Sequence, residues 1–333
     1  MKSPLVSICV PTYNRPLFLK QAMESAIAQT LNDFDLIVLD NSENDESRLV
    51  CESFCDDRIR YIKNEKNVGG IVNMLRIVKY IRGQYVKFLM DDDLLKPDCL
   101  AEMVAAMEQY PTAGVVMAPM EIIDENGKKI APVFYGFQKM ELRYEYLKEN
   151  RLIKNTAILK DFLTETYPCC VPTGIMYRKE CFDRLGNFDL AADFACDLEI
   201  NMRFAKRYDF YYIAKPLVLW RYIPSSATGN MHLQGINISR FYYITKRFLA
   251  DPEVLALFPE SERPRLIRDS YFFASFRAML NVMTGLKTFN LRLIGKTLIL
   301  VFREEKYFTN ILKLPVVALK QIFAAIKSSR LAR

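Results

Sequence analysis

The sequence predicts an α/β fold in which a mostly parallel, right-handed sheet is flanked by helices and followed by a helical C-terminal region. Two observations predict it: short apolar stretches recur along the first 120 residues, and amphipathic stretches separate them. Strands that are buried on both faces read as nearly continuous runs of Val, Ile and Leu. Alternation of strands and helices implies parallel strands that are joined by helical crossovers.

The expected strands of the first part are Leu5–Val10, Phe34–Leu39, Arg58–Lys63, Tyr85–Met90 and Gly114–Pro119. The expected helices between them are 16–30, 44–55, 69–82 and 98–110. Pro16 and Pro97 stand where a first helical residue is expected, and Gly83 stands just past a helix end. After residue 120 a second α+β portion follows, with elements expected at Gly174–Tyr177, 195–208, Phe210–Ile213 and Leu217–Tyr222. From about residue 235 the pattern is helical.

The composition fits a globular protein with one sizeable core and a smaller appended unit, because 51% of the 333 residues are hydrophobic and 26% are charged. The eight cysteines include no C-x-x-C pair, and His232 is the only histidine, which makes a zinc finger improbable and favours free thiols in a reducing compartment. The first residues read as a strand rather than a signal peptide, and no apolar run reaches the length of a spanning helix. We therefore expect a cytoplasmic protein that does not span the membrane.

The positive charge is concentrated in the last 47 residues. Residues 287–333 hold ten Lys or Arg and two Glu, a net charge of +8 that leaves −1 for residues 1–286 in a chain of net +7. Apolar side chains at helical spacing accompany Lys313, Lys320 and Lys327. A basic amphipathic helix over 305–333 would suit an anionic membrane surface at the inner face of the membrane. The alternative is a helix that packs on the core or on another subunit of a homo-oligomer. Nucleic acid is not an expected partner, because no binding motif accompanies the lysines.

Three consecutive carboxylates, Asp91, Asp92 and Asp93, follow the apolar run Tyr85–Met90. In an open α/β sheet, ligands bind at the carboxyl ends of the strands. Adjacent carboxylates repel one another unless a cation or hydrogen bonds offset their charge. Mg²⁺ takes one or two carboxylates together with substrate phosphates, and Mn²⁺ accepts similar ligands. The run therefore suits a metal–diphosphate complex, and the alternative is a solvated acidic turn that caps the next helix.

Three further polar segments follow predicted strands: Val10–Arg15, Asp40–Ser42 and Asn67–Gly70. Since the carboxyl ends of parallel strands meet at one edge of the sheet, these segments and the carboxylates should lie along one rim. Each segment alone is also compatible with an ordinary turn, because Asn, Asp, Gly and Ser are common turn residues.

Taken together, these segments resemble family 2 glycosyltransferases, which have the GT-A fold. The matching stretches are VSICVPTYNRPLFLKQAMESAIAQT, DLIVLDNSENDES and NEKNVGGIVNMLRIVKYIRGQYVKFLMDDDLLKPD. A further stretch, LGNFDLAADFACDLEINMRFAKRYDFYYIAKPLVLWRY, resembles the acceptor half of the family. The resemblance covers about residues 4–228. It implies a catalytic domain over 1–230, with a nucleotide-sugar half at 1–120 and an acceptor half at 121–230, and a separate region at 231–333.

The resemblance also implies roles for individual residues. The residues placed beside the nucleotide sugar are Pro11, Thr12, Tyr13, Arg15, Asp40, Asn67, Gly69, Asp91 and Asp92. Asp93 corresponds to the direct ligand of a divalent metal, Mn²⁺ or Mg²⁺. Asp197 corresponds to the general base, although without the resemblance a surface carboxylate paired with Arg203 is the simpler interpretation.

Two positions depart from the family pattern. Cys196 precedes Asp197 where the family often has Glu, and Ile223 stands where many members carry a histidine after Arg221. The missing histidine leaves Ser226 and Thr228 as candidates for weak phosphate contacts.

The activity that the resemblance implies is an inverting transfer of a sugar, of the hexosyltransferase kind, from a nucleoside diphosphate to a hydroxyl of a glycan or lipid-linked acceptor, in bacterial surface polysaccharide biosynthesis. A sugar nucleotidyltransferase would be expected to carry a Gly-rich basic loop after the first strand, and this chain has Pro-Thr-Tyr-Asn-Arg there. A non-catalytic nucleotide-sugar-binding protein is the other alternative, and the presence of both Asp93 and Asp197 argues against it.

Overall fold

The structure is a computed structural model of the chain, and it describes residues 3–130, 134–135, 138–139, 148–164, 171–223, 236–287 and 291–303. The chain divides into two compact units. The first comprises Met1–Ala131, Arg143–Phe162 and Tyr167–Ile223, and the second comprises Pro132–Leu142, Leu163–Thr166 and Pro224–Arg333. The division at residue 230 into a catalytic domain and a C-terminal region remains a prediction.

The first unit is built on an eight-stranded mixed sheet with the order β10-β12-β6-β11-β4-β1-β2-β3. Its strands are β1 (Val6–Thr12), β2 (Phe34–Asp40), β3 (Ile59–Lys63), β4 (Tyr85–Phe88), β6 (Ala113–Met117), β10 (Arg151–Ile153), β11 (Ile175–Arg178) and β12 (Asp209–Tyr212). Parallel pairs join β1 to β2 and β4, β2 to β3, and β6 to β12, whereas β11 runs antiparallel to β4 and β6. The predicted α/β class with a mostly parallel sheet is confirmed.

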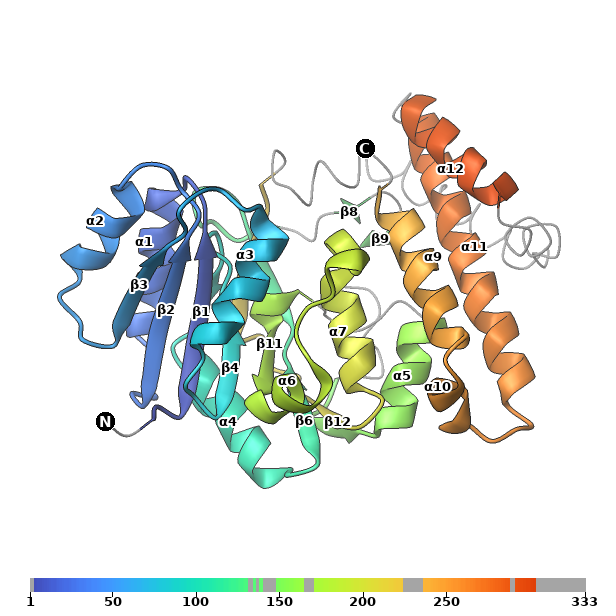
Figure 1. Cartoon of the computed structure of the whole chain (residues 1–333), viewed down its shortest axis with the longest axis horizontal. Helices are drawn as coiled ribbons and strands as arrows, with labels where there is room; N and C mark the ends of the chain where they lie inside the picture. The colour runs from blue at the N-terminus through green and yellow to red at the C-terminus, as the bar shows by residue number, and fades with distance from the viewer. Residues whose placement is uncertain are drawn as a thin grey trace. The chain divides into compact units, whose positions relative to one another are not determined.

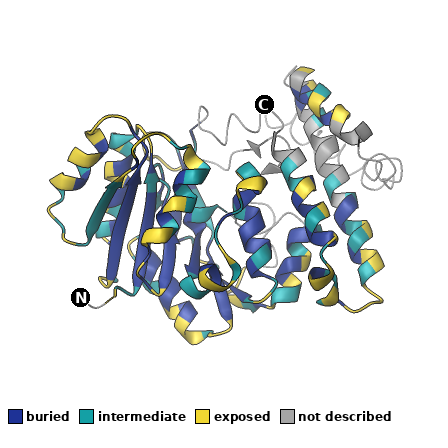
Figure 2. Cartoon of the chain, viewed as in Figure 1, coloured by how far each residue is buried: buried dark blue, intermediate teal, exposed yellow. Residues whose placement is uncertain are grey.

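Helices cover both faces of this sheet (Figure 1). On one face lie α1 (Pro16–Ile27), α2 (Glu46–Ser53) and α4 (Cys99–Gln109), and on the other lie α3 (Gly70–Ile77), α6 (Lys179–Leu185) and α7 (Cys196–Phe204). The apolar strands are buried between these layers (Figure 2). The sequence reads as continuous apolar runs because both faces of each central strand are covered.

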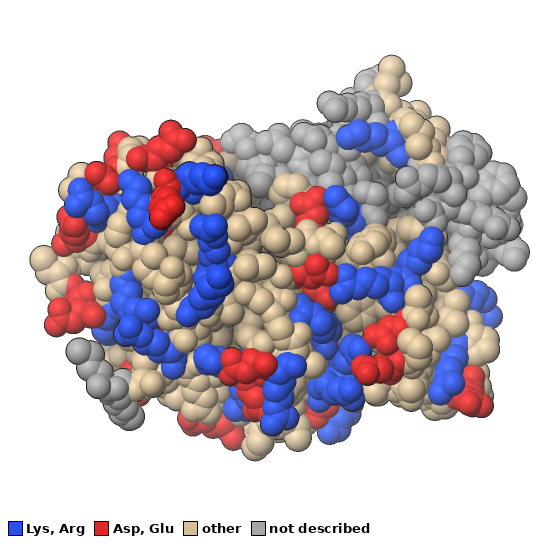
Figure 3. Space-filling view, viewed as in Figure 1, with Lys and Arg blue, Asp and Glu red and all other residues tan. Residues whose placement is uncertain are grey.

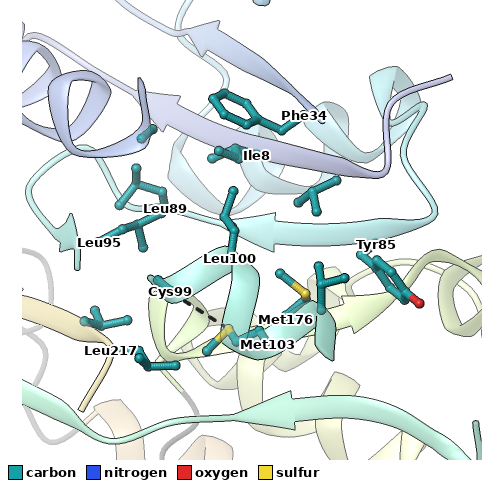
Figure 4. Close-up of a cluster of buried hydrophobic side chains, with 14 of the residues drawn as sticks. Ile8, Phe34, Tyr85, Leu89, Leu95, Cys99, Leu100, Met103, Met176 and Leu217 are labelled. Carbon is teal, nitrogen blue, oxygen red and sulfur yellow. Dashed lines mark hydrogen bonds between the residues drawn. The ribbon is translucent and has the colours of Figure 1, made fainter. Parts of the chain in front are cut away.

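Side chains alternate between two cores. Leu100 and Met103 of α4 pack in one cluster with Ile8 of β1, Tyr85 of β4 and Met176 of β11 (Figure 4). The opposite core is aromatic, and most of its rings meet edge to face at centroid distances of 5.2–6.2 Å. Its members are Phe88, Tyr177, Phe182, Phe188 and Phe204, and the rings of Phe88 and Phe182 are tilted at 6.4 Å. Acidic and basic side chains are interspersed over the first unit in the view of Figure 3.

A small second sheet extends the first unit with the order β5-β13-β7. Its strands are β5 (Leu94–Leu95), β7 (Met120–Ile123) and β13 (Val218–Arg221), and β13 pairs antiparallel with β5 and parallel with β7. Since β5 begins immediately after Asp93, this sheet brings the end of β13 beside the three carboxylates.

Two predictions about helix ends are wrong. Pro97 does not begin a helix, because α4 begins at Cys99 with Asp98 as its N-cap. Gly83 does not end one, because α3 ends at Ile77 and a 3₁₀ turn intervenes before it. Gly83 instead lies against β1, where a Cβ would come within 2.5 Å of the backbone nitrogen of Ser7.

In the second unit the described residues are mainly helical, as predicted. Its helices are α9 (Ile236–Leu249), α10 (Pro252–Ala256), α11 (Arg263–Lys287) and α12 (Leu291–Arg303), and α11 packs against α9 and α12. A short hairpin of β8 (Phe134–Tyr135) and β9 (Gln138–Lys139) belongs to the same unit. Among the described helices, none has the length and apolarity needed to cross a bilayer. The predicted basic helix at 305–333 lies outside the described residues.

Candidate functional site

The loops that follow β1 and β2 lie side by side, as the sequence predicts. Thr12 at the end of β1 is in register with Asp40 at the end of β2. The backbone N–H of Asn14 donates to the hydroxyl oxygen of Ser42 at 2.8 Å, and the N–H of Asn41 donates to the carbonyl of Thr12 at 2.9 Å. These hydrogen bonds join the two loops into one rim at the carboxyl ends of the strands. Pro11 lies in β1, paired with Leu39 of β2, just before the two loops begin.

The loop after β3 is attached to this edge by side-chain amides. Asn41 donates from Nδ2 to Oδ1 of Asn67 at 2.6 Å, and the N–H of Gly69 donates to the same oxygen at 2.8 Å. Gly69 has a φ of +86°, a conformation that glycine adopts without strain. No atom lies within 4 Å of the position of a Cβ on Gly69, so the space beside this loop is open to a ligand.

Asp40 is fully buried below the rim. Its carboxylate accepts hydrogen bonds from the N–H of Ser42 and from the hydroxyl of Tyr61, both at 2.8 Å. Burial and the Asp40 carboxylate raise the pKa of Tyr61 well above its usual range. Each oxygen of the Asp40 carboxylate thus already accepts one hydrogen bond from the protein. The contact of Asp40 with a nucleotide base stays a prediction.

Asp91 and Asp92 contact the first loop directly. The hydroxyl of Thr12 donates to Oδ2 of Asp91 at 2.8 Å, and the N–H of Tyr13 approaches the same oxygen at 3.4 Å. The guanidinium of Arg15 pairs with Asp92 at 2.6 Å and with Asp91 at 3.4 Å. Burial and the charge of Asp92 raise the pKa of Asp91 to about 6. The structure thus brings together five residues that were predicted to lie beside the nucleotide sugar: Thr12, Tyr13, Arg15, Asp91 and Asp92.

Asp93 is almost completely buried, with 1% of its surface exposed. Its Oδ2 accepts a hydrogen bond from the hydroxyl of Thr173 at 2.6 Å, and its Oδ1 accepts one from the backbone N–H of Arg221 at 2.9 Å. Burial, with the charge of Asp92 added, raises the pKa of Asp93 well above its ordinary value.

The carboxylates of Asp91, Asp92 and Asp93 have the chemistry that a hard divalent cation needs. Each oxygen of Asp93 accepts one of the two hydrogen bonds described above, and a carboxylate has about four acceptor sites in all. No group of three or more His, Cys, Asp or Glu side chains in the described part of the chain is arranged as a preformed metal cage. Mg²⁺ does not need one, since it commonly takes one or two carboxylates with phosphate and water.

Arg221 holds the carboxylate turn in place from β13 and is 3% exposed. Its guanidinium donates to the carbonyl of Asp92 at 2.8 Å, to Oε1 of Gln21 in α1 at 2.7 Å, and to the carbonyls of Asp124 and Glu125 at 3.1 and 2.9 Å. Neither Arg221 nor Thr173 was predicted to contact the carboxylates, and no sequence motif marks Thr173. Ser226, Thr228 and His232 lie outside the described residues.

Asp197 lies in the first turn of α7 and is partly exposed. The surrounding protein desolvates its carboxyl and raises the pKa to about 7. An ion pair with Arg203 is not present, because Arg203 pairs with Glu199 at 2.8 Å. The hydrogen bonds described for Asp197 stay within its own helix and do not join Asp197 to the rim. The preceding 3₁₀ segment, Leu190–Ala195, packs against α3, and α3 begins at the rim.

Comparison with known proteins agrees with this geometry. The family described as "Glycosyl transferase family 2" matches residues 7–186. An uncharacterized glycosyltransferase of Methanocaldococcus jannaschii is 34% identical over 167 residues, which are 48% of this chain and 57% of the relative. The chain is also 29% identical over 161 residues, 47% of its length, to a UDP-Glc:alpha-D-GlcNAc-diphosphoundecaprenol beta-1,3-glucosyltransferase of Escherichia coli and covers 58% of that enzyme.

Among solved structures, a mannosyltransferase of Pyrobaculum calidifontis in complex with GDP-Man and Mn²⁺ has a TM-score of 0.55 at 15% identity, with 96% of this chain and 86% of that chain covered. At this identity the structural likeness shows the shared fold alone. The family match extends over more than half of the chain and includes all four rim loops. The chain therefore belongs to glycosyl transferase family 2.

Proposed function

We propose that the protein is an inverting glycosyltransferase that moves a sugar from a nucleoside-diphosphate sugar to a hydroxyl of a glycan or lipid-linked acceptor. The observation that carries this proposal is the hydrogen-bonded rim, in which Thr12, Tyr13 and Arg15 meet Asp91 and Asp92 within a family 2 sequence. The nucleotide would bind along this rim, beside Pro11, Asp40, Asn67 and Gly69.

Asp93, with its neighbours Asp91 and Asp92, would hold a divalent cation, Mn²⁺ or Mg²⁺, together with the diphosphate of the donor. When bound, such an ion stabilises the negative charge that grows on the leaving diphosphate. Burial, with the charge of Asp92 added, raises the pKa of both Asp91 and Asp93, and a bound cation would offset the cost of keeping these carboxylates ionised. The Thr173 hydroxyl and the Arg221 N–H hold the Asp93 carboxylate in a fixed orientation.

Asp197 would act as the general base that takes the proton from the acceptor hydroxyl. A pKa of about 7 suits that task, since a base is most efficient when its pKa lies near the working pH. One base and one displacement invert the configuration at the anomeric carbon, whereas retention through a covalent intermediate requires a nucleophilic carboxylate on the opposite face of the sugar.

The acceptor is proposed to be a glycan or a lipid-linked sugar of bacterial surface polysaccharide biosynthesis. The relative in Escherichia coli bears a diphosphoundecaprenol-linked acceptor in its name, which supports this choice. A lipid-linked acceptor would place the protein at the inner face of the cell membrane, and the basic segment 305–333 would contribute to that association.

The test is a thermal-shift screen of UDP-, dTDP- and GDP-sugars with and without Mn²⁺ or Mg²⁺. We expect one nucleotide class to raise the melting temperature in a metal-dependent way. Asp93→Ala should abolish the metal-dependent part of the shift, and Asp57→Ala, which changes an exposed aspartate away from the rim, should retain it. A metal response that survives in Asp93→Ala would exclude the metal role of Asp93.

A further inference from the structure

We propose that Thr173 is a positioning residue that fixes the Asp93 carboxylate for cation binding, and that Lys87 in turn fixes Thr173. The inference rests on the metal role proposed above for Asp93. Two sets of contacts support it. One links Lys87 in the middle of β4 to the turn before β11, and the other links that turn to Asp93, which follows β4.

Thr173 lies in the 3₁₀ turn Pro172–Gly174 and is fully buried. Its Oγ1 accepts a hydrogen bond from the N–H of Met90 at 3.2 Å and donates to Oδ2 of Asp93 at 2.6 Å. A backbone N–H can only donate, so the Met90 N–H occupies a lone pair on Oγ1. The hydroxyl proton is therefore directed toward Asp93.

The second oxygen of Asp93 is held from a different strand. Oδ1 accepts the backbone N–H of Arg221 at the end of β13, at 2.9 Å. With one donor on each oxygen, from β13 and from the turn before β11, the plane of the carboxylate is defined. A carboxylate that is held this way loses little rotational freedom when it binds a cation.

Lys87 fixes the turn that carries Thr173. Its side chain is fully buried in β4, and its Nζ donates to the carbonyl of Thr173 and, at 3.3 Å, to the carbonyl of Ile175. A buried ammonium group is costly unless it is hydrogen-bonded, so the two carbonyls and the lysine hold one another in place. The backbone of Thr173 is thus anchored by Lys87 while its hydroxyl holds Asp93.

The isosteric substitution Thr173→Val removes the hydroxyl and keeps the volume. We would measure the binding of Mn²⁺ to the whole 333-residue chain by electron paramagnetic resonance of the free ion, with UDP, dTDP and GDP each present in turn as the probe. Loss of an outer hydrogen-bond partner weakens metal affinity by about 10–100-fold, and we expect Thr173→Val to fall in that range. Thr173→Ser retains the hydroxyl and should bind Mn²⁺ far more tightly than Thr173→Val, with an affinity close to that of the wild type.

The chain offers a matched control in Thr112, whose hydroxyl donates to Oδ2 of Asp209 at 2.8 Å near the opposite ends of the strands. Thr112→Val removes the same kind of hydrogen bond and should leave Mn²⁺ affinity unchanged. If Thr173→Val does not fold, Thr173→Ala removes the hydroxyl without placing a methyl group there, and the same loss of affinity is expected.

The outcomes separate this inference from the metal role itself. Unchanged Mn²⁺ affinity in the variant without the hydroxyl, together with loss of binding in Asp93→Asn, would overturn the role of Thr173 and leave that of Asp93 intact. A loss in Thr173→Ser as large as that in Thr173→Val would also overturn it. Absence of nucleotide-dependent Mn²⁺ binding in the wild type with UDP, dTDP and GDP alike would overturn the metal role and, with it, this inference.

Discussion

Arg203→Met should destabilise the first unit by about 3–5 kcal/mol, the cost of removing one partner of a buried ion pair. Glu199 is fully buried, and the Arg203 side chain is 18% exposed. The guanidinium makes hydrogen bonds of 2.9 and 2.8 Å to the two oxygens of Glu199. It also donates to the carbonyls of Leu185, Gly186 and Asn187, which connect α6 to the segment before α7. The substitution removes the guanidinium from the buried carboxyl of Glu199 and loosens the helix that carries Asp197.

A neighbouring pair provides the control. Arg184 and Glu180 in α6 have the same i,i+4 spacing and a distance of 2.8 Å, but their side chains are 71% and 44% exposed. Exposed pairs of this kind contribute about 0.3–0.5 kcal/mol, so Arg184→Met should change stability by no more than that. The residue types and the spacing are the same, so the two variants compare a buried pair, whose arginine also holds three backbone carbonyls, with an exposed pair.

Urea denaturation followed by tryptophan fluorescence measures both variants. Trp220 is the only tryptophan of the chain and lies in β13 of the first unit, so the signal reports on that unit. We expect a large shift of the midpoint for Arg203→Met and almost none for Arg184→Met. Equal midpoints for the two variants would refute the reasoning that burial makes the Arg203 pair important.

Three further predictions follow from the structure. The value of kcat/KM should rise with pH through about 7 and then level off, because Asp197 can accept a proton only when it is ionised and its pKa is raised to about 7. A kcat/KM that does not change between pH 6 and pH 8 would count against Asp197 as the base. Gly83→Ala should lower the free energy of unfolding, measured by urea denaturation, by about 1–3 kcal/mol, as substitutions that overpack a site do, because its Cβ would lie 2.5 Å from the nitrogen of Ser7. Gly70→Ala should lower the free energy of unfolding far less, because no atom lies within 4 Å of a Cβ at that position. Removal of residues 305–333 should reduce pelleting with anionic liposomes, and equal pelleting of both forms would exclude this segment as a membrane anchor.

The strands and the rim were accessible to sequence reasoning because their signals are local. The runs that end at Val10, Leu39 and Met90 are mainly apolar, and each is followed by a polar segment that contains Thr12, Asp40 or Asp91. Parallel strands place such ends together whatever the details of packing. The contact of Thr12 and Arg15 with Asp91 and Asp92 is the direct consequence.

Contacts between distant segments were not accessible in this way. Strand β11 inserts antiparallel between β4 and β6, and nothing near Ile175–Arg178 signals that position. The partners of Asp93, Thr173 and Arg221, lie 80 and 128 residues away along the chain. Likewise, the burial of Asp40 under the Tyr61 hydroxyl and the desolvation of Asp197 depend on tertiary packing, which local patterns do not contain.

Asp197→Asn separates the proposed deprotonation of the acceptor by Asp197 from the proposed binding of the donor at the rim. Once a donor and an acceptor are identified, turnover and donor affinity are measured for the wild type and the variant. Loss of a general base costs about 10²–10⁴-fold in rate, and we expect a fall of kcat in that range with donor affinity unchanged. Near-normal turnover in Asp197→Asn, with the donor bound as tightly as in the wild type, would contradict the account.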